Sequence, residues 1–460
     1  MREAAPMSWT PEALAALVEP DRAHRAVYAD PALFDLEMER IFGRAWLLLG
    51  HESQIRKPGD YFTAKMGKQG VIVSRGDDGA VHVLYNRCTH RGSTICALNA
   101  GHSATFVCPY HGWQFETDGT LRSVPVPEGY DEDWRAAMKR LNLRRVARVE
   151  IYRGFIFASL AETGQSLADF LGPIATSIDD LVDRAPDGEV EVAGGVGRHV
   201  YDGNWKFVIE NHLDTIHPRF VHASSVSASK AQDDAAHATV AGEIGLRQMR
   251  QNGAPAEVWE GIGLNACPNG HAYMGDYHDD ETLLRKSQDP VHAEYRRRLE
   301  ARLGPERTRE VLRVSRFNTI VYPNLSFMSQ FGQLRIVTPL AVDKTLTTTF
   351  VFRLKGAPEE MFRASIAFAN IVNGAGSCVL TDDLEVYERM QTGVNTDVDW
   401  LDYARGLGRD RPTGADGFEH GASGTSEIHL RRQMETWRAY MTDETGPAAA
   451  AEPEGARDAA

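Results

Sequence analysis

The chain has 460 residues, 42% hydrophobic and 25% charged, which is the composition of an ordinary globular protein with two or three domains. A formal net charge of −14 argues against a general nucleic-acid binder, because such proteins usually carry a basic surface. No apolar run approaches the roughly 18 residues of a transmembrane helix, and the N-terminus lacks the apolar core of a signal peptide. We therefore expect a cytoplasmic protein without membrane spans.

The first half of the chain is predicted to alternate between helical and β-rich regions. Residues 8–45 should be helical, since Thr10 can cap a helix that begins at Pro11 and apolar residues then recur three and four apart. From about Gly59 to residue 160, short β-rich runs are separated by Gly, Asp and Pro. Residues 161–230 are predicted to be helical again.

The second half is predicted to mix helices and strands. Residues 230–310 include a charged helical stretch, "AEYRRRLEARLGPERTREVL", and the segments "NTIVYPNLSFMSQF" and "TLTTTFVFRL" resemble strands. Residues 358–391 should form two helices separated by "NGAGS", and the low-complexity tail 446–460 should be disordered. The predicted fold class is α+β. A small all-β domain, residues 45–160, is inserted in a larger domain built from residues 1–44 and 161–445.

Two Cys–His pairs lie within the β-rich region. Cys88 and His90 are one residue apart, and Cys108 and His111 are two residues apart. The five cysteines of the chain are too few and too scattered for a disulfide scaffold, so these are candidate metal ligands. Two Cys and two His can hold a structural zinc ion or a Rieske 2Fe–2S cluster. Each loop supplies one ligand of each kind, whereas zinc fingers usually place their His pair on a helix.

A second candidate site follows in "GNWKFVIENHLDTIHPRFVH". If Trp205 to His217 form a helix, Asn211, Asp214 and His217 share one face, and His222 follows after a turn. Two neutral imidazoles and a carboxylate form the facial triad of non-haem ferrous iron. A pair of histidines five residues apart is by itself more typical of a structural role.

The third ligand should be a carboxylate far along the chain, and "CVLTDDLEVYERMQ" is the best segment. Thr381 can cap a helix that begins at Asp382. Both Asp382 and Asp383 are candidates, and Asp382 could instead favour the helix N-terminus by its charge.

The motifs resemble those of a known family. "CTHRG" with "CPYHGW" is similar to the Rieske signature, and E-N-x-x-D-x-x-H-x-x-x-x-H resembles the iron motif of Rieske non-haem iron ring-hydroxylating oxygenases. The resemblance covers nearly the whole chain and is strongest to large (α) subunits of the benzoate, toluate and anthranilate branch. It selects Asp383 over Asp382 as the third ligand. Ile216 stands where that branch usually has Tyr.

The resemblance implies a helix-flanked antiparallel catalytic domain of the helix-grip kind. It implies a 2Fe–2S cluster on Cys88, His90, Cys108 and His111, and mononuclear Fe(II) on His217, His222 and Asp383. Electrons should come from NAD(P)H through a reductase, with or without a ferredoxin. The expected assembly is a homotrimer, with or without three β subunits, in which the catalytic residue Asp214 bridges one subunit's cluster to the next subunit's iron.

The implied reaction is cis-dihydroxylation of an aromatic ring with O2, with an aromatic carboxylate as the expected substrate. Arg335 in "QLRIV" could bind that carboxylate, although a surface position on a strand is the simpler interpretation. A Rieske monooxygenase or demethylase is the alternative enzyme. An electron-transfer protein without oxygenase activity is the alternative of a different class.

Overall fold

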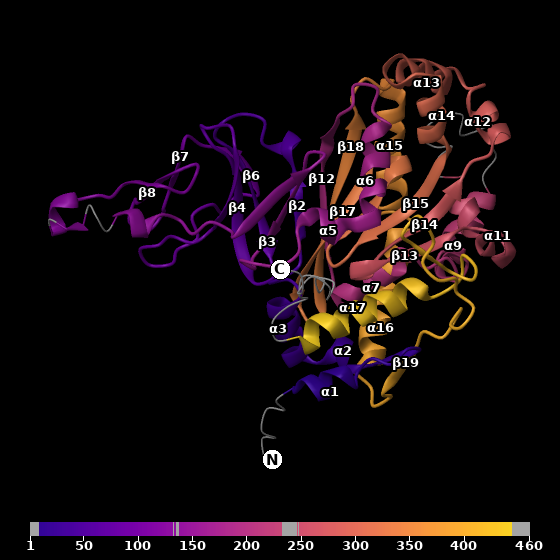
Figure 1. The fold of residues 1–460 in the computed structure, drawn as a ribbon, viewed down its shortest axis with the longest axis horizontal. Coiled ribbons are helices and arrows are strands. Elements are labelled where there is room, and N and C mark those ends of the chain that lie inside the picture. Colours follow the sequence, from indigo (N-terminus) through magenta and orange to yellow (C-terminus); the bar gives the residue numbers. More distant parts are fainter. Residues whose placement is uncertain (1–8, 132, 135–137, 232–245, 247, 444–460) are drawn as a thin grey trace, which may run out of the picture.

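The computed structural model describes residues 9–131, 133–134, 138–231, 246 and 248–443, and consists of a large lobe and a small lobe that projects from its side (Figure 1). The small lobe is β-rich, and the large lobe combines one long sheet with helices on both faces. This is the α+β arrangement that the sequence predicts. The expected tail 446–460 lies outside the described residues.

The small lobe is built from short antiparallel strands. They form a four-stranded sheet in the order β5-β4-β3-β6, and three-stranded sheets in the orders β7-β8-β9 and β10-β11-β2. Its strands are β2 (Leu47–His51), β3 (Asp60–Met66), β4 (Gln69–Arg75), β5 (Val81–Tyr85), β6 (Ala100–His102), β7 (Thr105–Val107), β8 (Gln114–Glu116), β9 (Leu121–Ser123), β10 (Arg148–Tyr152) and β11 (Phe155–Ser159). The β-rich runs of the sequence predict most of these strands.

The large lobe contains an eight-stranded antiparallel sheet in the order β12-β18-β17-β16-β15-β14-β13-β20. Its strands are β12 (Val190–Tyr201), β13 (Leu264–Cys267), β14 (His271–Tyr277), β15 (Val314–Val321), β16 (Leu325–Met328), β17 (Gln333–Ala341), β18 (Lys344–Leu354) and β20 (Glu419–His420). A separate pair joins β1 (Arg22–His24) to β19 (Trp400–Asp402).

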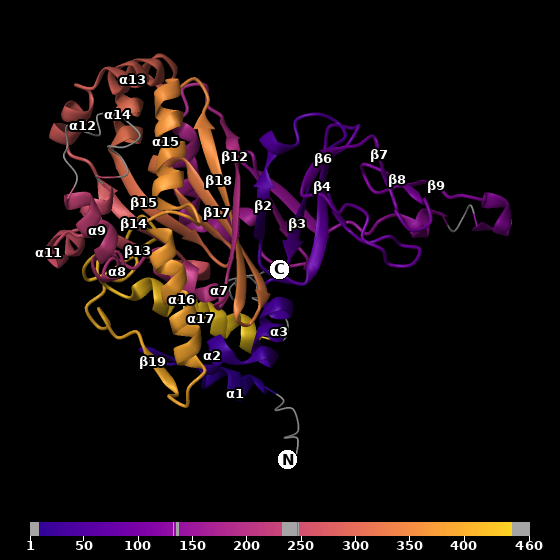
Figure 2. The same cartoon turned by 180° about the vertical axis from the view of Figure 1, so that it is seen from behind.

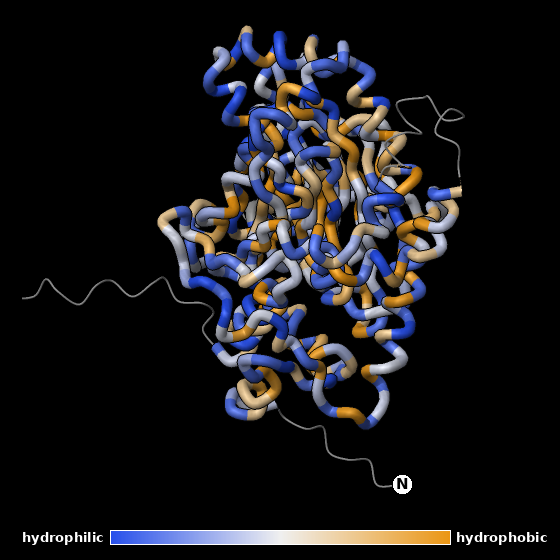
Figure 3. Tube along the Cα trace, turned by 90° about the vertical axis from the view of Figure 1, so that its right-hand side faces the viewer, coloured by the Kyte–Doolittle hydropathy of each residue, from blue (hydrophilic) through white to orange (hydrophobic). Residues whose placement is uncertain are grey.

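Helices cover both faces of this sheet. α15 (Glu359–Val372) and α16 (Leu380–Val394) lie in front of it in Figure 2, and α6 (Ala175–Asp183) and α17 (Ile428–Thr442) lie in front of it in the opposite view of Figure 1. Since both faces are covered, hydrophobic residues gather along the middle of the lobe (Figure 3).

The remaining helices lie at the ends of the large lobe and between its strands. They are α1 (Pro11–Ala15), α2 (Ala26–Ala29), α3 (Pro31–Arg40), α5 (Leu167–Leu171), α7 (Trp205–Asn211), α8 (His217–Val221), α9 (Ala223–Lys230), α11 (Ala256–Glu260), α12 (Asp280–Lys286), α13 (Pro290–Leu303) and α14 (Pro305–Arg313). Thr10 caps α1 as predicted, because its side chain accepts a hydrogen bond from Ala13 N at 3.3 Å.

The predicted helical region 161–230 is wrong in its middle, where β12 runs. β12 pairs with β18 along its whole length, with a bulge between Ala193 and Val196. The bulge contains Gly194 and Gly195, which both have positive φ angles. Pairing with a strand about 150 residues away overrides the weak local preference.

The predicted helix from Trp205 to His217 is also shorter in the structure. α7 ends at Asn211, and α8 begins only at His217. The side chain of Asn318 on β15 donates a hydrogen bond to His212 O at 2.7 Å, and Asp214 Oδ1 accepts one from Ile216 N at 2.6 Å. These side-chain bonds replace the helical pattern between the two helices.

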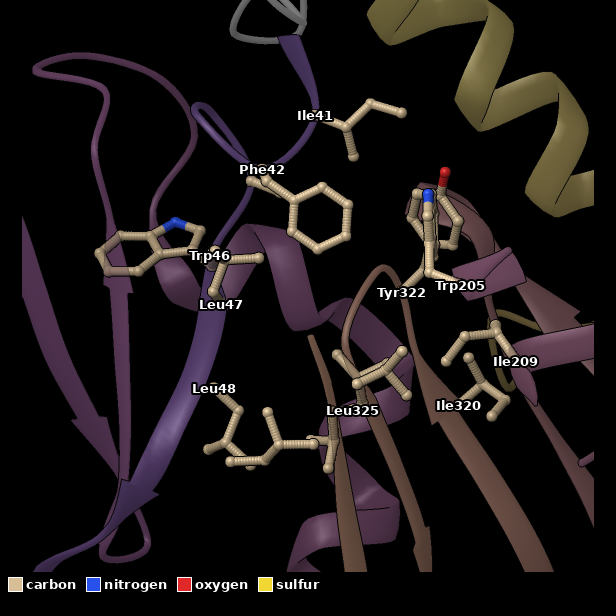
Figure 4. Packing of buried hydrophobic residues seen from close by; sticks show 14 of the residues in the cluster. Ile41, Phe42, Trp46, Leu47, Leu48, Trp205, Ile209, Ile320, Tyr322 and Leu325 are labelled. Atoms are coloured by element: carbon tan, nitrogen blue, oxygen red, sulfur yellow. The ribbon is translucent and has the colours of Figure 1, made fainter. Parts of the chain in front are cut away.

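The two lobes share one buried core. Leu48 of β2 exchanges two hydrogen bonds with the side chain of Asn324, at 3.1 and 3.0 Å, and points toward Leu325 of the large sheet (Figure 4). On the other side of this sheet, Ile209 of α7 lies beside Ile320. The core therefore connects the small lobe to strands β15 and β16, against which α7 packs.

Candidate cluster and iron sites

The two Cys–His loops of the small lobe have matching backbone hydrogen bonds. In the first loop, Gly92 N donates to Cys88 O at 3.0 Å, and in the second, Gly112 N donates to Cys108 O at the same distance. Both glycines have positive φ, 77° and 70°, which side chains rarely adopt. The two tight loops thus present their ligands in the same way.

The four side chains of these loops converge. The Cys88 and Cys108 thiols are buried and close enough to shift one another's pKa, and the rings of His90 and His111 have centroids 4.6 Å apart. His111 Nδ1 is buried without a hydrogen-bond partner. Two paired thiols and two neighbouring imidazoles, one with a free nitrogen, are a donor set that fits a 2Fe–2S cluster held by two Cys and two His.

Aromatic rings support the two imidazoles. His90 stacks on Trp113, with ring centroids 4.8 Å apart and planes 2° apart, and His111 lies against Tyr110 at 3.7 Å. His90 and Tyr110 are exposed, whereas Cys88 and Cys108 are buried. The histidine side of the site therefore faces the surface of the chain.

In the large lobe, α8 and α16 bring together His217, His222 and Asp383. Asp383 Oδ1 lies 3.7 Å from His217 Nε2 and 3.5 Å from His222 Nε2, and one ligand atom from each residue lies within 4.8 Å of the others. Two imidazoles and one carboxylate that converge in this way fit a mononuclear iron and leave positions open for other ligands.

Two neighbouring side chains hydrogen-bond to these residues, and the carboxylate of a third lies nearby. Asn211 Nδ2 donates to Asp383 Oδ1 at 3.3 Å, and Asp382 Oδ2 lies 3.4 Å from His222 Nδ1. Asp214 Oδ1 lies 3.8 Å from His217 Nδ1. Such outer contacts fix the tautomer and the orientation of a metal-binding imidazole.

Burial and these neighbours shift the proton affinities within the site. Burial raises the pKa of Asp383 to about 6 and lowers the pKa of His222 to about 4. Burial would also lower the pKa of His217, but the carboxylates of Asp214 and Asp383 outweigh it and raise that pKa. Near neutral pH His222 is thus available as a neutral nitrogen ligand.

The start of the helix that carries Asp383 differs from the sequence prediction. The helix that carries Asp383 begins at Leu380, and its end is held by Ser377, whose Oγ accepts from Leu380 N at 3.0 Å. Thr381, the predicted cap, instead donates to Ser377 O at 2.6 Å. Ser377 stands at the end of the predicted "NGAGS" break, so the sequence already contained this signal.

Arg335 also differs from its simpler interpretation as a surface residue. It is 5% exposed, because helices cover the sheet face that it occupies. Gln333 on the same strand is fully buried and accepts a hydrogen bond from Asn373 at 2.7 Å. No sequence pattern points to Gln333 or Asn373, since their proximity depends on how α15 packs against the sheet.

Comparison with known families identifies both lobes. A model of the Rieske [2Fe-2S] domain matches residues 45–141, and a model of the ring hydroxylating alpha subunit (catalytic domain) matches residues 188–443. The chain belongs to the family of ring-hydroxylating oxygenase alpha subunits. The predicted family, fold and enzyme class are thereby confirmed, and a Rieske 2Fe–2S cluster and a non-haem iron are its cofactors.

Relatives of this alpha subunit include dioxygenases named for aromatic acids. The toluate 1,2-dioxygenase alpha subunit of Pseudomonas putida is 36% identical over 422 residues, which cover 90% of this chain and 86% of that protein. The anthranilate 1,2-dioxygenase large subunit of Acinetobacter baylyi is 33% identical over 389 residues, which cover 84% of this chain and 80% of that protein.

The solved structures agree with this assignment. Naphthalene 1,2-dioxygenase with indole bound in the active site matches with a TM-score of 0.77 and 28% identity over 93% of this alpha subunit and 94% of that chain. A quaternary ammonium Rieske monooxygenase shares the fold at 18% identity, with a TM-score of 0.65; the match covers 94% of this alpha subunit and 98% of that chain.

Within the described part of the alpha subunit, no helix is both long and apolar enough to cross a membrane.

Proposed function

We propose that this alpha subunit adds both atoms of O2 to the ring of an aromatic carboxylate and forms a cis-diol. The convergence of His217, His222 and Asp383 in a lobe of this family carries the proposal, because a facial triad leaves adjacent positions for O2 beside the substrate. The substrate class is supported by relatives named for toluate, 2-halobenzoate and anthranilate.

Each site residue then has a defined role. Cys88, His90, Cys108 and His111 would hold the 2Fe–2S cluster, and His217, His222 and Asp383 would hold Fe(II). When bound, these groups supply single-electron transfer and O2 activation. Asn211 and Asp382 orient the iron ligands through the contacts described above.

The electrons are inferred to come from NAD(P)H through a reductase, with or without a ferredoxin, which is consistent with a cytoplasmic location. We divide the chain into a Rieske domain of residues 45–160, set between residues 1–44 and 161–445 of the catalytic domain. The Rieske histidines lie on the surface side of their site, where a second protein could approach them.

We further infer a homotrimer, with or without three β subunits. Asp214 supports this assembly. Its side chain is 43% exposed in the single chain, although it lies only 3.8 Å from His217. A carboxylate in this position can hydrogen-bond a histidine of a neighbouring subunit while it orients the iron ligand. Light scattering of the purified protein, alone and with a co-expressed β subunit, tests the stoichiometry.

Labelled oxygen tests the reaction. The purified oxygenase, supplied with a surrogate reductase and NADH, is given a panel of benzoates under 18O2. Two labelled atoms in a cis-diol product are expected for at least one acid. Incorporation of a single atom, with a phenol or a demethylated product formed directly, would replace the proposal with a monooxygenase.

A further inference from the structure

The sheet of the large lobe has one unusually polar face. Residues directly opposite one another in antiparallel strands share a face, and one such row consists of Ile320, Ser326, Arg335 and Thr349. Ile320 lies beside Ile209 of α7, so this row faces α7 (Figure 4). Gln333 shares this face because it is two residues from Arg335.

Several buried polar atoms on this face have no hydrogen-bond partner. Buried polar groups of native proteins are nearly always satisfied by protein, water or ligand. The unsatisfied atoms here are Asn318 Oδ1, Ser326 Oγ, Gln333 Nε2, Arg335 Nη1 and Thr347 Oγ1. Their grouping on one face of one sheet indicates that a ligand or ordered water completes their hydrogen bonds.

Arg335 is the only one of these five that carries a charge. Its Nη1 has no partner, and its Nη2 reaches only the sulfur of Met328 at 3.5 Å, which is a weak acceptor. No carboxylate of the described residues forms an ion pair with it. Burial lowers its pKa to about 10, so it remains protonated near neutral pH. A buried, unpaired cation is costly unless an anion reaches it.

The face with Arg335 also lies on the iron side of the sheet. α7 packs against β17, which carries Arg335, and Asn211 at the end of α7 donates to Asp383. Gln333, two residues before Arg335, is bonded to Asn373, which directly follows α15 and precedes the helix of Asp383.

We propose that Arg335 is the specificity-determining residue that binds the carboxylate of the substrate, with Gln333 Nε2 as a second donor. A guanidinium presents two parallel N–H groups that match a carboxylate, and both Nη atoms of Arg335 lack a strong acceptor. The ring attached to this carboxylate would then lie between β17 and the iron ligands. The inference rests on the proposed function, since it assigns the counter-ion of its substrate class.

The test compares an acid with a neutral molecule of the same shape. Arg335→Met keeps an unbranched apolar stem and removes the guanidinium with its charge, and Arg335→Lys keeps a charge but not the paired donors. For Arg335→Met we expect the KM of benzoate to rise at least about tenfold, the usual weight of a hydrogen bond to a charged group, while the KM of benzamide changes less than about threefold. The KM of benzoate in Arg335→Lys should lie between the values of wild type and Arg335→Met.

A binding measurement without turnover accompanies the kinetics. Benzoate should raise the melting temperature of the wild-type protein in the absence of a reductase, and this shift should disappear in Arg335→Met. Arg353→Met is the matched control. Arg353 lies on β18 and is also an arginine of the sheet, but its guanidinium is already paired with Glu191 at 3.3 Å and Glu359 at 3.6 Å. That control should leave the ratio of the two KM values unchanged.

The outcomes are separable. If Arg335→Met, with normal iron content, keeps the wild-type ratio of benzoate to benzamide, the inference is overturned. If Arg335→Met does not fold, an unchanged ratio in Arg335→Lys overturns it equally. If the wild type is not stabilised by any aromatic acid and oxidises none, the inference fails with its substrate class. A single labelled oxygen atom in the product overturns only the dioxygenase reaction and leaves the role of Arg335 standing.

Discussion

Asp382 and Asp383 are adjacent in the chain, and their carboxylates approach opposite nitrogens of one imidazole ring. Asp383 Oδ1 lies 3.5 Å from Nε2 of His222, and Asp382 Oδ2 lies 3.4 Å from Nδ1 of the same ring. Asp383 also reaches His217, at 3.7 Å, whereas Asp382 is near only one of the two histidines. The two neighbours therefore have different roles despite their identical chemistry.

This difference predicts different effects of the same substitution. Asp383→Asn should abolish binding of the mononuclear iron, because it removes the only carboxylate of the triad. Asp382→Asn should keep the iron but weaken its binding about tenfold or more, which is typical when an outer partner of a metal-bound histidine is lost. Titration of metal-free protein with Fe(II) measures both. Equal affinities in the two variants would contradict the assignment.

The separation of the two sites leads to a second prediction. His217→Ala or His222→Ala should reduce the iron content from about three to about two atoms per chain, because only the mononuclear site is lost. The visible and EPR spectra of the Rieske cluster should be unchanged. His90→Cys should do the reverse, altering the cluster spectrum while the second site still binds iron. Loss of the cluster signal in folded His222→Ala protein would argue that the sites are not independent.

The sequence predicted those parts of the fold around the candidate sites that depend on local structure. The Cys–His loops are short hydrogen-bonded turns, so ligand spacing and Gly92 and Gly112 were sufficient to recognise them. The strand β12 was missed because its partner β18 is distant and its glycines weaken the local signal. The end of α7 was missed because the side chain of Asn318 on β15, which is distant in sequence, donates a hydrogen bond to His212 O just after the helix.

Arg335 illustrates the same limit at the level of function. Its strand carries alternating side chains, and the pattern alone cannot tell which face is exposed. Here α7 and α15 cover the face with Arg335, so the side chain is buried. The spacing of Asn211, Asp214 and His217 was informative even though the helix is broken. The loop that follows α7 still places Asp214 next to His217.

A buried glutamate on α7 predicts a dependence of stability on pH. Burial raises the pKa of Glu210 to about 7, and Tyr28 donates a hydrogen bond to it at 2.7 Å. An unfolded glutamate titrates near its ordinary value of 4.5. Between these two values the folded chain holds a proton that the unfolded chain has lost, so this group makes the protein less stable as pH rises through the window.

The full effect of Glu210 is on the order of 3 kcal/mol above pH 7, from the size of the shift. Glu210→Gln should remove this loss of stability. The melting temperature of the variant minus that of wild type should therefore increase by a few degrees when the pH is raised from 4.5 to 7.5. Calorimetry at a fixed scan rate measures this difference. Glu388→Gln, at an exposed position on α16, is the control and should show no such trend. If the difference in melting temperature between Glu210→Gln and wild type is the same from pH 4.5 to pH 7.5, Glu210 is charged throughout this range.

The last prediction concerns Asp214, which we expect to link the two centres between subunits. Its Oδ1 accepts hydrogen bonds from Ile216 N at 2.6 Å and His217 N at 3.1 Å, and these bonds hold the loop before α8. Asp214→Asn keeps an oxygen for both amides and removes only the charge, so the fold and both metal centres should be retained. Turnover should nevertheless fall severely, because the link to the neighbouring cluster depends on a carboxylate.

A single-turnover experiment separates this role from a structural one. The reduced protein is mixed with substrate and O2, and oxidation of the cluster is followed by its visible absorption. In Asp214→Asn this rate should fall by at least about a hundredfold while the iron content stays at the wild-type level. Asp382→Asn, loaded with iron, is the matched control, since it also removes a carboxylate beside an iron-site histidine but at a position away from Asp214. Oxidation of the cluster at the wild-type rate in Asp214→Asn would remove Asp214 from the electron route and leave it only the task of orienting His217.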